Sequence, residues 1–181
     1  MKAIMLLGTG FEPLEAVAPC DILRRGGVEV VLASIGAQLV TAGHGVRIMA
    51  DCTLDAVNAD EADMVILPGG LGGVEAILAS DAALELVRRV HARGGYVAAI
   101  CAAPTILAAL GLLEGKKATC YPGMEDRMAG ALMQPCGTVR DGKILTGRAA
   151  GSAADFGLLL LAALRGEEAA SQVAKEIVYY R

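Results

Sequence analysis

Cys101 stands where a nucleophile can be presented to a substrate. The apolar run Tyr96–Ile100 is typical of a buried strand, and Pro104 suits the first turn of a helix, so Cys101 occupies the turn between them. Ala99 and Ala103 lie two residues before and after it, where the nucleophile elbow of hydrolases also needs small side chains. We therefore expect the thiol at the carboxyl end of a sheet, beside a helix N-terminus that favours thiolate.

The local sequence also fits a second interpretation, in which Cys101 is a small apolar residue in an alanine-rich core. A nucleophile needs partners, and two segments can supply them. The glycine-rich run from Pro68 to Gly73 follows the apolar stretch Met64–Leu67 and can offer backbone N–H groups to an oxyanion, although an ordinary glycine turn fits it as well.

The second segment is the start of the first expected helix, which carries Glu12 and Glu15. We interpret Glu12 as a surface carboxylate that favours the helix dipole. Glu15 lies one turn further and can point across the strand ends. A buried carboxyl there would have a raised pKa and could donate or accept protons.

The elements that must position these residues alternate along the chain. We expect strands at Lys2–Leu7, Val28–Ser34, Met64–Leu67 and Tyr96–Ile100, helices at Pro13–Arg25, 81–93, Pro104–Leu110, Met124–Met128, Ala153–Leu164 and Glu167–Val178, and hairpins at 38–50 and 138–145. Alternating strands and helices predict an α/β fold with a mostly parallel central sheet covered on both faces. The simplest organisation is a single domain over residues 1–181.

Composition narrows the class of protein. The net charge of −4 gives no basic surface for nucleic acid or anionic lipid, and the apolar runs are too short to span a bilayer. We expect a soluble cytoplasmic protein with reduced thiols, because the five cysteines form no C-x-x-C pair and no export signal precedes them. With only two histidines, neither near a cysteine in sequence, a metal site is not expected.

Several motifs together resemble the ThiJ/PfpI superfamily, in the branch of the parkinsonism-associated deglycase and its bacterial relatives. They occur in that family's order over nearly the whole chain, and they are the runs 10–16 (GFEPLEA), 21–27 (DILRRGG), 67–70 (LPGG), 98–104 (AAICAAP) and 155–157 (DFG). The resemblance implies a flavodoxin-like three-layer sandwich with a nucleophile elbow, and a homodimer. It implies no metal and no organic cofactor.

The resemblance also assigns roles to residues. It implies a nucleophile at Cys101 and, at Glu15, a protonated carboxyl that bonds the thiolate and acts as general acid and base. It implies oxyanion donors at the backbone N–H groups of Gly70 and Ala102.

The chain departs from related families in its histidines. None follows Cys101, and Ala102 stands where the protease-like branch has one, so amide hydrolysis by a Cys-His pair lacks its base. Tyr121 replaces a family histidine near the cysteine and can donate a hydrogen bond to substrate, but it is no neutral-pH base. His44 falls where the family has a cationic residue that can reach the partner subunit's site, and a surface turn histidine is an equal alternative.

Three functions follow as hypotheses. The first is an enzyme that converts a 2-oxoaldehyde such as methylglyoxal into a 2-hydroxy acid through a hemithioacetal on Cys101, or that repairs glycated protein by the same chemistry, with Glu15 moving the protons. The second is an oxidative-stress sensor in which Cys101 is oxidised to sulfinic acid. The third, which we favour least, is a binding protein with a vestigial site.

Overall fold

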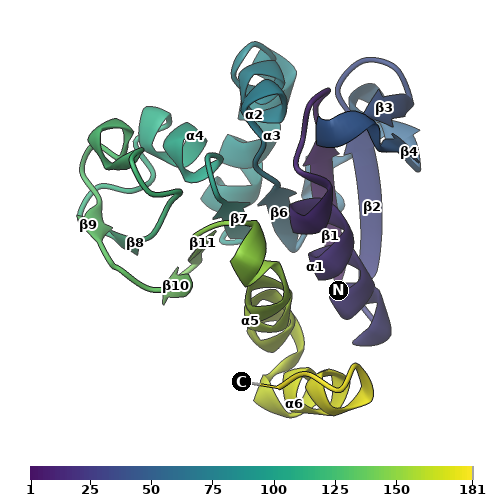
Figure 1. Cartoon of the computed structure of the whole chain (residues 1–181). Coiled ribbons are helices and arrows are strands. Elements are labelled where there is room, and N and C mark those ends of the chain that lie inside the picture. Colours follow the sequence, from purple (N-terminus) through teal and green to yellow (C-terminus); the bar gives the residue numbers. More distant parts are fainter. Residues whose placement is uncertain (181) are drawn as a thin grey trace.

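The computed structural model describes residues 1–180, and its centre is a seven-stranded sheet (Figure 1). The strand order is β10-β11-β7-β6-β1-β2-β5, and all neighbours are parallel except the antiparallel pair β10 and β11. The strands are β1 (Lys2–Leu7), β2 (Glu29–Ser34), β5 (Cys52–Thr53), β6 (Met64–Leu67), β7 (Tyr96–Ile100), β10 (Thr138–Asp141) and β11 (Ile144–Gly147). Two small sheets stand apart from it: β3 (Leu39–Thr41) with β4 (Arg47–Met49), and β8 (Lys117–Ala118) with β9 (Leu132–Met133).

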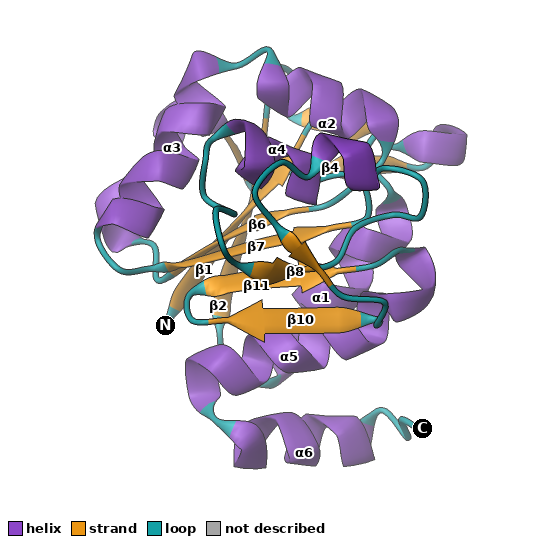
Figure 2. Cartoon of the chain, turned by 90° about the vertical axis from the view of Figure 1, so that its left-hand side faces the viewer, coloured by secondary structure: helices purple, strands orange, loops and turns teal. Residues whose placement is uncertain are grey.

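Helices cover both faces of the large sheet, which confirms the expected three-layer sandwich (Figure 2). One face packs against α1 (Pro13–Arg25) and α5 (Ala153–Arg165), and α6 (Glu167–Glu176) packs against α5. The other packs against α2 (Leu71–Leu78), α3 (Asp81–Ala92) and α4 (Pro104–Ala109). Strand β1 shows why both layers are needed, because Met5 belongs to the first core, its neighbours Ile4 and Leu6 belong to the second, and all three are fully buried.

The sequence interpretation missed α2. The run from Pro68 to Gly73 was expected to be a glycine loop, but the chain enters a helix directly after Gly70. The glycines in that helix serve packing: a Cβ at Gly73 would lie 2.8 Å from Phe11 Cα. Close approach to the β1–α1 loop therefore explains glycines that lower the intrinsic helix propensity.

Three smaller features complete the comparison with the expected elements. The helix expected at Met124–Met128 is a single 3-10 turn, Glu125–Arg127. Helix α3 is capped by Ser80, whose side chain accepts a hydrogen bond from the Ala83 N–H at 3.2 Å. The hairpin expected at 38–50 is present as β3 and β4.

The strand order reverses direction between β1 and β6, because the chain builds β2 and β5 on one side of β1 and β6, β7 and β11 on the other. Helix α1 follows β1 on one face, and α2 follows β6 on the other. The loops after these two strands therefore diverge at the carboxyl edge, which is where open α/β sheets bind ligands.

Candidate active site

Cys101 forms a tight turn between β7 and α4. Its φ is 66°, in the left-handed region that residues other than glycine rarely adopt. Its backbone N–H donates to the Gly147 carbonyl at the end of β11 (2.9 Å), and the Ala103 N–H donates to the Ile100 carbonyl (3.0 Å). Helix α4 then begins at Pro104. The expected elbow is confirmed, and it holds the thiol half-buried at the carboxyl end of β7.

Glu15 lies in the first turn of α1, and its side chain is fully buried. An acidic residue at this position often reaches back to the backbone N–H of the helix cap. Here the cap is Glu12, and its N–H donates instead to the Gly69 carbonyl (2.9 Å). Glu15 is free to turn inward, where its Oε2 accepts a hydrogen bond from the Gly69 N–H (2.8 Å). The backbone N–H and carbonyl of Gly69 thus join the start of α1 to the end of β6.

The Glu15 carboxyl also lies beside the Cys101 thiol. Within residues 1–180, Oε1 is a buried side-chain oxygen without a well-aligned hydrogen-bond partner. The Glu15 carboxyl and the Cys101 thiol are nevertheless close enough to interact, and this interaction lowers the pKa of Glu15 while it raises that of Cys101. The two residues, 86 positions apart in the chain, form one acid–thiol pair.

Two backbone N–H groups also lie near the sulfur. Those of Gly70 and Ala102 interact with the Cys101 thiol and lower its pKa. Gly70 has a φ of 84°, and a Cβ there would overlap the Gly10 carbonyl oxygen and the Glu12 nitrogen, so the position requires glycine. The oxyanion role that the family resemblance implies for these two N–H groups stays a prediction.

Burial dominates the electrostatics of the pair. Burial raises the pKa of Glu15 from 4.5 to about 7, although the hydrogen bonds from Cys101 and Gly69 oppose the shift. Burial, followed by the charge of Glu15, raises the pKa of Cys101 from 9.0 to about 12. The backbone N–H groups beside the start of α4 lower the thiol pKa, as expected, but burial and the carboxylate outweigh them, so the net shift is upward.

Two acids this close titrate as a unit. The first proton leaves the pair near pH 7 and the second near pH 12. At neutral pH the pair therefore passes to a state with one negative charge and one shared proton, and thiolate forms in it when that proton is on Glu15. The arrangement can pair a nucleophile with an adjacent acid.

Tyr121 and His44, the two remaining candidate residues, lie in different surroundings. The backbone N–H of Tyr121 donates to the Cys101 carbonyl (2.8 Å), so the segment lies beside the elbow, but the Tyr121 side chain is 48% exposed. His44 is exposed at a left-handed turn between β3 and β4. The neighbouring Gly43 N–H docks this hairpin on the Phe11 carbonyl (2.8 Å). Substrate contacts by Tyr121 and His44 stay predictions.

Gly69 is the functional residue that sequence reasoning missed, because it placed the donor of the glycine run at Gly70. The other four cysteines, Cys20, Cys52, Cys120 and Cys136, are also free thiols. Across residues 1–180, no group of three or more His, Cys, Asp or Glu side chains could hold a metal ion. No helix in that same part of the chain has the length and apolar character to cross a membrane.

Comparisons with known proteins identify a family match. The sequence model of the DJ-1/PfpI family matches residues 1–163. Protein dj-1beta of Drosophila melanogaster is 37% identical over 180 residues, which cover 98% of this chain and 96% of that protein. Deglycase PH1704 of Pyrococcus horikoshii is 37% identical over 131 residues, or 72% of this chain and 78% of that protein.

Solved structures extend the likeness to three dimensions. The crystal structure of Drosophila melanogaster DJ-1beta has a TM-score of 0.93 at 36% identity, with coverage of 99% of this chain and 98% of that one. The structure of oxidized Toxoplasma gondii DJ-1 has a TM-score of 0.94 at 34% identity and covers 99% of both chains. With its flavodoxin-like sandwich and its sequence matched over most of its length, the chain belongs to the DJ-1/PfpI family.

Proposed function

We propose that this chain is a cofactor-independent cysteine enzyme that converts 2-oxoaldehydes into 2-hydroxy acids, with methylglyoxal and lactate as the model substrate and product. The observation that carries the proposal is the fully buried Glu15 carboxyl, with its pKa raised to about 7, against the Cys101 thiol. Catalytic acids and bases work best when their pKa lies near the operating pH. We further propose that the chain acts as a single domain in the cytoplasm, where thiols stay reduced.

The proposed reaction begins when the shared proton moves to Glu15 and the Cys101 thiolate adds to the aldehyde carbon. The former carbonyl oxygen then carries negative charge, which the N–H groups of Gly70 and Ala102 can stabilise. Glu15 donates its proton to that oxygen, so that a neutral hemithioacetal results and the carboxylate is regenerated.

The same carboxylate then removes the hydrogen from the former aldehyde carbon. The electron pair left behind forms an enediol with the neighbouring ketone, whose oxygen takes a proton from water. Glu15 then returns its proton to the second carbon while the hydroxyl on the first carbon releases its proton to water, which gives a thioester of the 2-hydroxy acid. Water hydrolyses the thioester and restores the thiol, so the sum is one aldehyde and one water to one 2-hydroxy acid, with no redox partner.

Two features favour this chemistry over amide hydrolysis. The chain has only two histidines, His44 and His91, and both precede Cys101, so no imidazole base follows the nucleophile. The hydrogen-bonding acid at the thiol is a carboxyl group that can exchange protons near pH 7. The Pyrococcus relative is named a deglycase. We extend the proposed substrates to hemithioacetals and aminocarbinols on glycated protein, which present the same carbon to Cys101.

The proposal is tested by incubating the protein with methylglyoxal and measuring lactate. We expect Cys101→Ala to abolish lactate formation. Cys136→Ser, which removes an exposed thiol, should retain it. Lactate formation that survives in Cys101→Ala would refute the proposed nucleophile.

A second function, oxidative-stress sensing, has its own support. The N–H groups of Gly70 and Ala102 that lie near the sulfur could also hold the oxygens of a sulfinate on Cys101. The Toxoplasma relative of similar structure was solved as an oxidized protein. Intact-mass spectrometry after mild peroxide separates the two functions. Addition of two oxygens at Cys101 together with negligible aldehyde turnover would favour the sensor.

We also propose that the chain is a homodimer. Helix α1 exposes Leu14 (59%) and Val17 (52%), and strand β4 exposes Met49 (62%). Beside them lies a hollow of about 240 Å³ lined largely by apolar side chains, among them Ala16, Val17, Cys20, Leu32 and Ile48. Apolar patches of this kind mark interaction sites. Light scattering should give twice the mass of the chain, and Val17→Asp should give monomers.

A further inference from the structure

We propose that Gly69 is a positioning residue for the acid–thiol pair: the side chain it lacks leaves the space in which Glu15 reaches Cys101, and its N–H, which bonds Glu15 Oε2, leaves Oε1 to carry the acidic proton. This inference rests on the proposed function where it concerns turnover. Its first test is the reactivity of the thiol, which requires no aldehyde substrate.

The space at Gly69 is bounded by the reacting groups themselves. A Cβ at this position would lie 2.5 Å from Glu15 Oε2, 2.6 Å from Cys101 Cβ and 2.9 Å from the Ile100 carbonyl oxygen. Non-bonded carbon atoms prefer about 3.5–4.0 Å. Glu15 and the elbow thus approach each other across a gap that no side chain at 69 can share.

The peptide of Gly69 orients the carboxyl. Its N–H donates to Glu15 Oε2 (2.8 Å), and its carbonyl accepts from the Glu12 N–H (2.9 Å), so both sides of the residue are engaged. An oxygen that already accepts a hydrogen bond is the poorer place for the acidic proton. The proton is therefore carried on Oε1, the oxygen of Glu15 that accepts no hydrogen bond within residues 1–180.

The variant Gly69→Ala tests the space directly. Gly69 lies outside the left-handed region, so alanine can adopt its φ, but the added methyl group would overlap Glu15 and the elbow, which must shift to admit it. The Ile100 carbonyl and Cys101 Cβ belong to the backbone of the elbow and its first side-chain atom, whereas the Glu15 carboxyl is the end of a side chain. The carboxyl is the group that yields most easily, and we expect it to move away from the thiol while the elbow shifts by a smaller amount.

The experiment measures the rate of Cys101 alkylation by iodoacetamide on both sides of pH 7 in four proteins: wild type, Gly69→Ala, Glu15→Gln and the double variant. Wild type should show an inflection near pH 7, where the pair loses its first proton. Gly69→Ala should lose that inflection and follow Glu15→Gln. The double variant should match Glu15→Gln within about twofold, since groups that act through one another are not additive.

Turnover of methylglyoxal supplies the second readout. Small misplacements of reacting groups reduce rates roughly 10²-fold, and we expect that loss for Gly69→Ala in the wild-type background but not in Glu15→Gln. If wild type turns over no aldehyde, the proposed function fails while the alkylation profiles still decide the role of Gly69.

Two controls separate positioning from general crowding. In Gly8→Ala the new Cβ would lie 2.7 Å from Ala76 Cβ and 2.8 Å from the Gly73 carbonyl, at the same end of the sheet but away from Glu15 and Cys101. This variant should keep the inflection near pH 7. If Gly69→Ala does not fold, Glu15→Asp withdraws the carboxyl from Gly69 by one carbon and should lose the inflection. An inflection that persists in Gly69→Ala, or in Glu15→Asp, would overturn the inference.

Discussion

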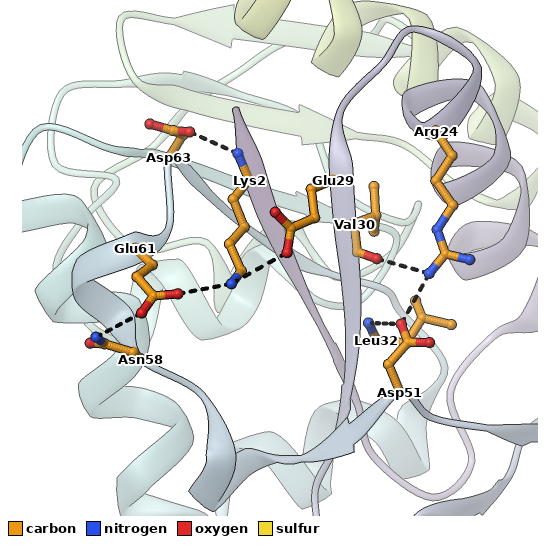
Figure 3. A network of polar contacts seen from close by, with 9 residues as sticks. All are labelled: Lys2, Arg24, Glu29, Val30, Leu32, Asp51, Asn58, Glu61 and Asp63. Carbon is orange, nitrogen blue, oxygen red and sulfur yellow. Dashed lines mark hydrogen bonds and ion pairs between the residues drawn. The ribbon is translucent and has the colours of Figure 1, made fainter.

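The amino edge of the central sheet, where its parallel strands begin, and the carboxyl edge, where they end, hold charged groups in opposite ways. At the amino edge, Lys2 bridges Glu61 (2.9 Å) and Glu29 (3.4 Å), while its backbone N–H donates to Asp63 (2.8 Å) (Figure 3). The carboxylates of Glu29 and Glu61 are more than half exposed. At the carboxyl edge, Glu15 is fully buried, and no lysine or arginine within residues 1–180 forms an ion pair with it.

The same side-chain type therefore has opposite titration behaviour. The hydrogen bond from Lys2 lowers the pKa of Glu61, so that group stays ionised and helps to fasten strand ends. Burial raises the pKa of Glu15 to about 7. A carboxyl kept from water and from cations is unsuited to stabilising the fold at neutral pH, but it is suited to exchanging a proton with a thiol.

The largest expected effect lies in turnover. Glu15→Gln keeps the size of the side chain but removes its acidic proton, and general acid–base groups contribute roughly 10²–10⁴-fold to rate. We expect a loss of that size in lactate formation from methylglyoxal. Glu29→Gln, the same substitution at the amino edge, should leave the rate unchanged. Equal losses in both variants would remove the distinction between the edges.

The next effect is on stability and its dependence on pH. Because the pKa of Glu15 rises from 4.5 to about 7 on folding, the native state retains a proton that the unfolded chain releases. The free energy of unfolding should therefore fall as pH rises from 4.5 to 7, by roughly 3 kcal/mol in total. Urea unfolding at several pH values measures this fall, which should be absent in Glu15→Gln. A wild-type protein equally stable at both ends of this range would contradict the burial of the ionising carboxyl.

The smallest effect is expected at the amino edge. Lys2→Met removes both ion pairs of Lys2, but exposed pairs contribute little and are screened by salt. The loss in free energy of unfolding should be smaller than the pH effect of Glu15 and should shrink when salt is added. Urea titrations of wild type and Lys2→Met at low and high ionic strength provide the measurement. A large loss in free energy of unfolding that salt does not alter would contradict this expectation, because it would mean that the ion pairs of Lys2 are shielded from solvent.

Much of the fold could be predicted from the sequence, because its signals are local. The apolar run Tyr96–Ile100, followed by Cys101 and Pro104, is enough to predict a strand, a tight turn and a helix start. Helix α2 could not be predicted in this way. Gly72 and Gly73 argue against a helix on propensity, and only their packing against the β1–α1 loop explains them.

The sequence indicated which residues form the candidate site better than it indicated their pKa values. The position of Glu15 in the first helical turn and the family resemblance indicated that it pairs with Cys101. The rise in the thiol pKa depends on burial and on a carboxylate brought from 86 residues away, and no local pattern carries that information. The role of Gly69 was missed for a similar reason, since its neighbours come from α1 and from the elbow.

The left-handed backbone at Cys101 has a consequence for how this protein can change. A side chain in that conformation costs about 1–2 kcal/mol, which glycine would not incur. Cys101→Gly should therefore resist urea better than Cys101→Ala, by about 1 kcal/mol, while both lack the thiol. At this residue, the side chain that activity requires lowers the stability of the fold. Where selection no longer maintains the reaction, the single substitution Cys101→Gly would remove the thiol and relieve the backbone strain at the same time.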